Sequence, residues 1–270
     1  FQAAHPELDV PNPVQRWGQP ELESRRVGFN VKAHANDTLE LYAFGLYSHS
    51  DGVSDFNWRN PDTTTGAYRT TAIFPGWNLR SLYPVGFSPQ YGNVQNDLQL
   101  VGGLRGEITP KLRWDVSASY GRNAIDYRLK NSINASLGPS SPTRFKTGDY
   151  AFEQTLANVD VSRLFAQGDT LHTVATGVEF RVEHYETGAG DPASYAAGPF
   201  TDRPTGSQAG GGLTPQDEAG LDRDVASVYA SVSSNFGEKL STDAAVRYEH
   251  YSDFGGEVTG KLAARYEFVP

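Results

Sequence analysis

The stretch RYEHYSDFGGEVTGKLAARYEF, residues 247–268, contains two segments in which polar and apolar side chains alternate around a short turn. Arg247 and Glu249 flank Tyr248, and the second segment places Lys261 and Arg265 opposite Leu262 and Tyr266 in the same way. Alternation with a period of two is typical of a β-strand whose two faces have different surroundings. We therefore expect a hairpin with one watery face and one face that packs against another sheet or against lipid.

The same pattern recurs along the chain, which predicts about nine antiparallel strands rather than a single hairpin. The clearest pair has Leu112, Trp114 and Val116 on one parity and Arg113 and Asp115 on the other. The expected hairpins cover residues 24–50, 98–120, 157–183 and 228–249, with turns at 34–37, 109–110, 167–169 and 237–239, and a last strand covers 258–268. In the first hairpin the second strand is apolar on both parities, so its facing stays open.

The connections between these strands alternate in length. Short turns alternate with long irregular segments at residues 51–96, 131–149 and 188–222, which are longer than most loops of compact domains. Long loops at one end and tight turns at the other are how outer-membrane barrels are built. The predicted fold is all-β: an antiparallel, up-and-down segment of a transmembrane β-barrel with long outer loops and short periplasmic turns.

The two faces of the expected strands differ in the way that a barrel requires. Charges gather on one parity, where we expect them to line a water-filled lumen: Glu179, Arg181, Glu183, Asp243, Arg247 and Glu249. Aromatic residues lie on the apolar parity beside short turns, where an interfacial girdle is expected: Trp114, Phe165, Phe236 and Phe268. The alternative is a soluble sheet whose aromatic side chains close a core.

Composition narrows the function classes without naming one. The formal net charge of -9 argues against nucleic acid as a partner. No run approaches 18 apolar residues, so a transmembrane helix is excluded, whereas alternating barrel strands escape this test. The chain lacks cysteine and therefore thiolate chemistry. It starts at Phe1 and has no Met, so we expect a segment excised from a longer protein.

Several stretches resemble the barrel of TonB-dependent outer-membrane receptors of proteobacteria, and the similarity extends over nearly the whole chain after about Glu21. The most specific stretches are RYEHYSDFG, at residues 247–255, and SLGPSSPT, at residues 136–143. Further resemblance lies in LYAFGLYSHSDGVSDFNWRNP (41–61), WDVSASYGRNAIDYRLKNSINASLGPSSPTRF (114–145), GVEFRVEHYETGAGDPASY (177–195) and AVRYEHYSDFGGEVTGKLAARYEF (245–268).

The resemblance implies a 22-stranded barrel, plugged by an N-terminal domain, in the outer membrane of a Gram-negative bacterium. Its partners would be outer-membrane lipid, a small ligand such as a ferric siderophore or a glycan, and the TonB complex acting through the plug. We expect residues 1–270 to be one partial barrel domain, with the plug and the remaining strands absent. The implied function is import of a scarce nutrient, by default a ferric siderophore, driven by the proton motive force through TonB.

Motifs for covalent chemistry are missing, and no enzyme activity, cofactor or metal site is expected. The chain has no G-x-S-x-G and no complete P-loop, and its six histidines lack metal-site spacing. The carboxylates Glu179, Glu183 and Glu249 resemble an acid/base set for glycoside cleavage, but interleaved arginines favour a salt-bridge ladder.

The first long segment holds the best binding candidates, because aromatic rings and arginines together can stack on and pair with a chelate or a sugar. These candidates are Trp58, Arg59, Tyr68, Phe74, Trp77, Arg80, Tyr83 and Tyr91. Packing of the loop against itself explains the same residues equally well. Two rival functions remain open at this point: a passive porin-like channel, and a soluble secreted carbohydrate-binding protein or hydrolase.

Overall fold

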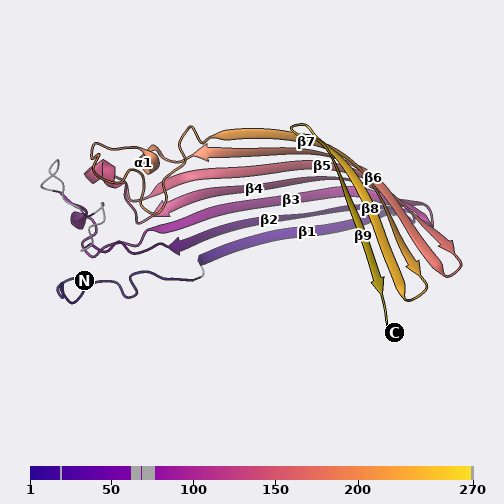
Figure 1. The fold of residues 1–270 in the computed structure, drawn as a ribbon, viewed down its shortest axis with the longest axis horizontal. Helices are drawn as coiled ribbons and strands as arrows, with labels where there is room; N and C mark the ends of the chain where they lie inside the picture. The colour runs from indigo at the N-terminus through magenta and orange to yellow at the C-terminus, as the bar shows by residue number, and fades with distance from the viewer. Residues whose placement is uncertain (19, 62–67, 69–76, 269–270) are drawn as a thin grey trace.

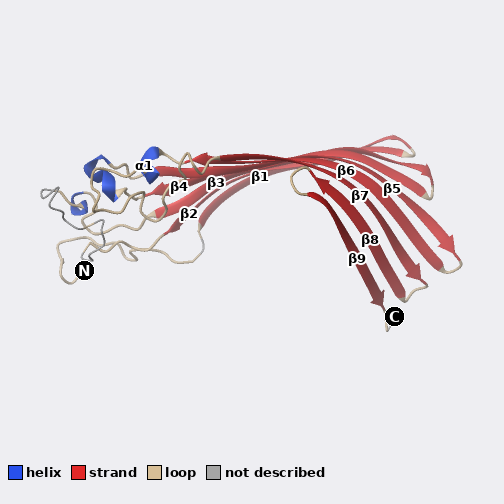
Figure 2. Cartoon of the chain, turned by 45° about the horizontal axis from the view of Figure 1, so that its top comes forward, coloured by secondary structure: helices blue, strands red, loops and turns tan. Residues whose placement is uncertain are grey.

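The computed structural model describes residues 1–18, 20–61, 68 and 77–268 of the chain. Within these residues the protein is one antiparallel sheet with a cap of loops at one end (Figures 1 and 2). The strands are β1 (Glu21–Asn36), β2 (Leu39–Asp55), β3 (Gln90–Thr109), β4 (Leu112–Lys130), β5 (Phe145–Gln167), β6 (Thr170–Ala189), β7 (Ala219–Phe236), β8 (Leu240–Tyr251) and β9 (Gly255–Tyr266).

The sheet is an up-and-down meander in which each strand pairs with its neighbours in sequence, in the order β1 to β9. Among the described residues β1 and β9 do not pair with each other, so the sheet is a curved open wall rather than a closed barrel (Figure 1). The expected nine antiparallel strands and their hairpins are confirmed. No helix in the described ranges is long and apolar enough to cross a bilayer.

Short turns lie at one end of the wall and long loops at the other (Figure 2). The loop end contains residues 56–89, 131–144 and 190–218, with the short helices η1 (Leu79–Ser81), η2 (Ala135–Ser140) and α1 (Pro192–Tyr195). These loops are shorter than the sequence predicts, because the strands continue beyond the strictly alternating segments. Near the loops both faces are partly polar, which removes the periodicity that marks a strand in sequence.

The first turn also differs from the expected residues 34–37, since β1 continues to Asn36 and only residues 37–38 remain between the strands. The Asn36 side chain explains this difference. Its Oδ1 accepts hydrogen bonds from the backbone N–H of Thr38 at 2.9 Å and from the Thr38 hydroxyl at 3.0 Å. A side chain that closes its own turn in this way lets the strand run to the turn itself.

Pairing register aligns the apolar positions of separate strands into rows. One row across β3 to β7 consists of Leu104, Val116, Val159, Val178 and Val228, each directly opposite the next. The adjacent row on the other face, from β4 to β8, consists of Ser117, Asn158, Glu179, Ser227 and Glu249. We call the face with the apolar row the outer face and the face with Glu179 the inner face.

Two glycines let tyrosine rings lie flat against the inner face. A Cβ on Gly103 would stand 2.5 Å from the Tyr42 hydroxyl oxygen, and one on Gly177 would stand 2.4 Å from that of Tyr229. Gly103 lies within β3, and its missing side chain leaves room for the ring of Tyr42 on the neighbouring strand. A glycine beneath an aromatic ring of the neighbouring strand is a known way to fix register in a barrel wall.

Candidate functional site

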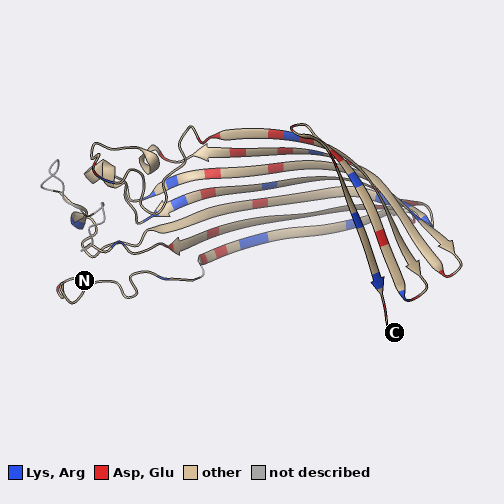
Figure 3. Ribbon diagram, in the orientation of Figure 1, with Lys and Arg blue, Asp and Glu red and all other residues tan. Residues whose placement is uncertain are grey.

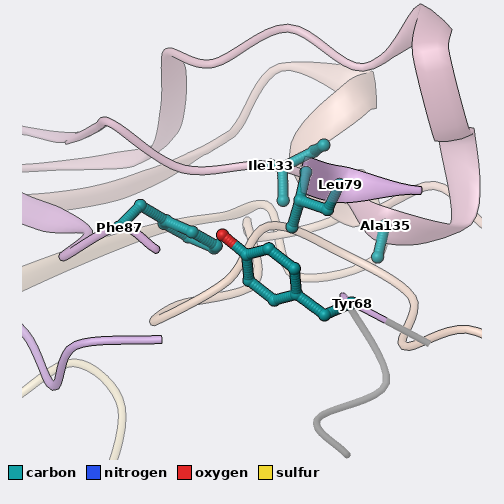
Figure 4. Close-up of a cluster of buried hydrophobic side chains, with 5 residues drawn as sticks. All are labelled: Tyr68, Leu79, Phe87, Ile133 and Ala135. Carbon is teal, nitrogen blue, oxygen red and sulfur yellow. The ribbon is translucent and has the colours of Figure 1, made fainter. Parts of the chain in front are cut away.

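The loop end has a hydrophobic core of its own, which we call the loop cluster: Tyr68, Leu79, Phe87, Ile133 and Ala135 (Figure 4). Leu79 is 0% exposed and Tyr68 is 6% exposed. Trp77 and Tyr83 pack against the cluster from its edge, and the Tyr83 ring stacks on Phe87 at a centroid distance of 4.5 Å. The described parts of the loops 56–89 and 131–144, which are far apart in sequence, therefore form one packed unit.

Asn134 joins this unit to the third loop. Its side-chain Nδ2 donates hydrogen bonds to the backbone oxygens of Ala193 at 2.9 Å and Ala196 at 2.8 Å. Its Oδ1 accepts from the Ser136 backbone N–H at 3.2 Å and from the Ser136 hydroxyl at 2.6 Å. Because Asn134 is fully buried, these bonds satisfy a polar group that would otherwise be costly to bury.

Two of the candidate binding residues, Tyr68 and Tyr83, are engaged within the loops. The Tyr68 hydroxyl donates to the Tyr83 carbonyl at 2.8 Å, and the Tyr83 hydroxyl donates to the Ser132 carbonyl at 3.2 Å. Burial raises the pKa of Tyr83 to about 12 and raises the pKa of Tyr68 as well. This geometry agrees with the alternative in which the loop packs against itself, and a role of either residue in binding stays a prediction.

Four further candidates of the first loop, Trp58, Arg59, Trp77 and Arg80, also have partners in the protein. Arg80 donates from Nη2 to the Pro61 carbonyl at 2.6 Å, and the Arg203 guanidinium lies 5.2 Å from the Trp77 ring centroid. The backbone of Arg59 pairs with Phe87, and the Trp58 ring lies edge-on to Phe1 at 6.2 Å. Phe74 lies outside the described residues.

Five of the six expected lumenal charges form one network on the inner face. Arg247 Nη2 lies 2.7 Å from Glu179 Oε1 and 3.0 Å from Glu249 Oε1. Arg181 lies 3.1 Å from Glu179 and 2.8 Å from Glu183. This is the geometry of a salt-bridge ladder, in which each carboxylate has an arginine neighbour. The sixth charge, Asp243, is separate and accepts a hydrogen bond from the Ser233 hydroxyl at 2.6 Å.

Sequence reasoning missed the extension of this network toward the loops. Arg223 lies 3.6 Å from Glu183 and makes a two-pronged contact with Asp253, with Nη2 to Oδ2 at 2.7 Å. Charged residues of both signs occur at several positions along the strands (Figure 3). Asp253 belongs to the short loop between β8 and β9, so its pairing with β7 becomes visible only once register is known.

The aromatic residues expected at a membrane interface lie on the outer face, near the short turns. Trp114 pairs with Val161, and Phe236 pairs with Leu240 at the turn between β7 and β8. Phe165 is 42% exposed and Phe268, just after β9, is 85% exposed. Exposed aromatic side chains near the short turns are what an interfacial girdle needs, and the contact of these residues with lipid stays a prediction.

A row of tyrosines on the inner face was also missed, and we call it the tyrosine track: Tyr91, Tyr127, Tyr150 and Tyr185, one from each of β3 to β6. Consecutive ring centroids lie 5.8, 5.6 and 6.4 Å apart. The sequence marks Tyr91 alone as a binding candidate. The other three give no local signal beyond a tyrosine near the loop end of a strand, and only register brings them together.

Within the described ranges no cluster of three or more His, Cys, Asp or Glu side chains is placed to hold a metal ion. The expectation of no metal site and no catalytic residue stays a prediction.

A wall with an apolar outer row, a charged inner face, short turns and long loops defines the class of outer-membrane-type β-barrel proteins. Residues 26–270 match the family model described as TonB dependent receptor-like, beta-barrel, and the chain belongs to this family. Members of the family are transport receptors of Gram-negative outer membranes rather than enzymes.

Solved structures agree with this fold at low sequence identity. The RagAB peptide transporter is 12% identical with a TM-score of 0.56, over 92% of this chain and 30% of that one. The unliganded ferric citrate transporter FecA is 11% identical with a TM-score of 0.54, over 93% and 34%. The siderophore receptor PirA from Acinetobacter baumannii is 12% identical with a TM-score of 0.51, over 92% and 32%.

The chain thus spans about a third of the length of these structures. A comparison of the sequence with curated proteins gives no significant match. At this level of identity the similarity establishes the fold alone, and the ligand has to be argued from the wall and the loops.

Proposed function

We propose that this chain forms part of the barrel wall of an outer-membrane receptor that imports a scarce nutrient with energy relayed by TonB. The observation that carries the proposal is the asymmetry of the wall within this family's barrel domain. Its outer face carries a continuous apolar row, which suits lipid, whereas its inner face carries the paired charges of Arg247, Glu179 and Glu249, which suit a water-filled lumen.

The proposed action is binding at the loop end followed by movement of the ligand through the lumen, without covalent chemistry. The packed loops support binding, because a preformed surface loses little conformational entropy when it takes a ligand. A ferric siderophore is the first cargo to test, since two similar structures are a ferric citrate transporter and a siderophore receptor. A peptide transporter has the same fold, so the cargo has to be tested directly.

The test is uptake by cells that produce the full-length receptor, with and without a functional TonB. We expect the receptor in the outer-membrane fraction, and nutrient-limited growth that disappears when TonB is inactivated. Growth on low iron with a ferric siderophore is compared with growth on a glycan as sole carbon source. Uptake that persists without TonB would instead support a passive channel, and recovery of the protein in the soluble fraction would exclude both membrane functions.

A further inference from the structure

The tyrosine track crosses the inner face just below the long loops. Tyr91 is the second residue of β3, and Tyr185 is four residues before the end of β6. Each of the four tyrosines is half-buried and keeps part of its ring accessible. The loops continue the track at its Tyr91 end, where Phe56 lies edge-on to the Tyr91 ring at 6.0 Å.

Register places all four tyrosines on the inner face, so they are not a membrane-interface girdle. Tyr127 stands opposite Asn93, Tyr150 opposite Ile125, and Tyr185 opposite Phe152. Both residues of each pair lie on the same face of the sheet as Glu179. Half-exposed aromatic rings that face the lumen instead of lipid do not anchor the barrel in the bilayer. They offer a series of flat surfaces to whatever enters from the loop end.

A hollow of about 380 Å³ lies on the side of the track away from the loops, and Phe152, which lines it, pairs with Tyr185 of the track. It is lined by Leu46, Asp97, Gln99, Asn123, Phe152 and Gln154, among others. Gly121, which also lines it, leaves the floor open, because a Cβ there would approach only the Leu98 carbonyl, at 4.0 Å. The hollow is within the 300–1,000 Å³ typical of small-molecule sites.

Charge restricts what this surface can take. The inner-face positions from Tyr91 to Gln99, Gly121 to Leu129 and Gly148 to Gln154 are all described, and Asp97 is the one charged residue among them. The nearest inner-face charges on the flanking strands are Arg26 on β1 and Glu183 on β6, and Glu183 is paired with Arg181. Arg122 also lines the hollow, but it belongs to the outer face of β4, and its Nε donates to Glu153 Oε1 at 2.7 Å. An anionic ferric chelate would therefore meet a carboxylate and no arginine or lysine of the inner face here.

The polar groups beside the rings are mainly amides. Asp97 accepts hydrogen bonds from Asn123 Nδ2 at 2.5 Å and from Gln95 Nε2 at 3.1 Å, which fixes the orientation of both amide groups. Amides and a carboxylate together supply the donors and acceptors that hydroxyl groups pair with. Flat aromatic surfaces with such groups beside them suit a ring that is apolar on its faces and hydroxylated at its edge.

We propose that the tyrosine track and the hollow beside it bind a neutral carbohydrate, with sugar rings stacked on successive tyrosines and hydroxyl groups bonded to Asp97, Asn123 and Gln154. The spacing of the rings lets an oligosaccharide pass from one tyrosine to the next on its way into the lumen. The inference rests on the proposed import function, because it names the class of cargo that this wall accepts.

Binding of maltotriose, cellotriose and xylotriose to the purified full-length receptor in detergent tests the proposal by isothermal titration calorimetry. At least one of these trisaccharides should bind, and Tyr150→Ala should weaken that binding about tenfold, the scale of one lost stacking partner. Tyr150→Phe keeps the ring and should bind within about threefold of the parent, since the loss of one hydroxyl group removes at most one weak hydrogen bond.

Tyr248→Ala is the matched control, because Tyr248 pairs with Val228 and Val258 on the outer face, lies outside the lining of the hollow and should leave binding unchanged. No binding of any of the three trisaccharides, or equal binding by the parent and Tyr150→Ala, would overturn the proposal. The proposal would also be overturned if no trisaccharide binds and the receptor instead binds ferric citrate in a way that Tyr150→Ala abolishes.

The calorimetry needs no TonB, so the two proposals fail separately. Trisaccharide binding with growth that is independent of TonB would contradict the import function and leave the carbohydrate site standing. The opposite result is TonB-dependent uptake of a ferric siderophore that Tyr150→Ala does not affect, together with no trisaccharide binding. It would contradict the carbohydrate site and leave the import function standing.

Discussion

The loop end and the strand wall of this protein are held together in different ways. In the loop cluster Leu79 and Ile133 are almost fully buried by other side chains of the same chain. In the wall Val159 is 43% exposed and Val178 is 52% exposed, although both lie in the middle of the sheet. The loops thus bury their own apolar side chains, whereas the wall leaves its apolar row for something outside the chain to cover.

This difference shows where each region obtains its stability. Backbone pairing along β1 to β9 satisfies the polar groups of the wall, and we expect the apolar outer row to gain its burial from lipid. The loop cluster gains burial from contacts between two loops, and Asn134 joins it to the third loop by hydrogen bonds, so its burial does not depend on the bilayer. Substitutions in the loops should therefore act locally, and those in the outer row should act on insertion of the whole wall.

The largest effect is expected from Leu79→Ala, because Leu79 is fully buried in the loop cluster. The lost contacts and the cavity should lower the stability of the loop end by about 2–5 kcal/mol. Limited proteolysis of the full-length receptor in detergent should show faster cleavage in the loops, with the barrel still resistant. Leu82→Ala, at a 45% exposed position of the same loop, is the control and should cleave like the parent. Equal cleavage of all three proteins would contradict an independent loop core.

A charge on the outer row should act on the wall instead. Val159→Arg should destabilise the barrel by about 2–4 kcal/mol if Val159 lies near the bilayer midplane. Urea titration of the receptor folded into phospholipid vesicles measures this loss. Asn158→Arg, one position away on the inner face, should cost much less because its side chain meets Glu179 across the strands. Similar losses for both variants would rule out the assignment of the faces.

A smaller and more local effect is expected from Asn134→Ala. This change removes the donors to the Ala193 and Ala196 carbonyls and should cost about 1–3 kcal/mol. Hydrogen exchange should accelerate in residues 190–218, which lose their tie to the loop cluster, while β3 to β6 stay protected. Ser140→Ala, an exposed position of the same loop, serves as the control. Uniform acceleration over the sheet would mean that the loops and the wall unfold together.

The smallest effect at neutral pH concerns Tyr83. Burial of its side chain raises the pKa of Tyr83 from 10.0 to about 12. Since the folded protein favours the neutral phenol, this contribution to stability is complete below about pH 10 and declines as the pH rises through about 12. Absorbance of tyrosinate near the alkaline end of a titration should show a late step that Tyr83→Phe lacks. A Tyr83 step at the pH of exposed tyrosines would argue against its packing on Phe87.

Much of the wall can be predicted from sequence because a strand that separates water from an apolar medium must alternate. The segments around Val116, Val159, Val178 and Val228 show this alternation, and the structure places them in one row. The prediction was least accurate near the loops, where polar residues occupy both faces and the strands extend beyond the alternating segments. The turn at residues 37–38 was also misplaced, since a single Asn36 side chain decides it.

The candidate site was less predictable for a different reason. The loop aromatics Tyr68 and Tyr83 are recognisable in sequence, but composition does not say whether a ring faces a ligand or a neighbouring loop. In the structure both hydroxyl groups donate to loop carbonyls. Conversely, Tyr127, Tyr150 and Tyr185 show nothing unusual in sequence, yet they lie within ring-contact distance of one another.

The sequence by itself determined the strands, their order and, except in β2, which face is apolar, because a period of two is a local property. That was enough to see residues 247–268 as one up-and-down step of a membrane wall. Only the tertiary structure decided which residues of different strands are neighbours, because register depends on pairing across the sheet. The loop cluster, the extension of the charge network to Asp253 and the tyrosine track all arise from register and loop packing, and these bring together residues that are distant in sequence.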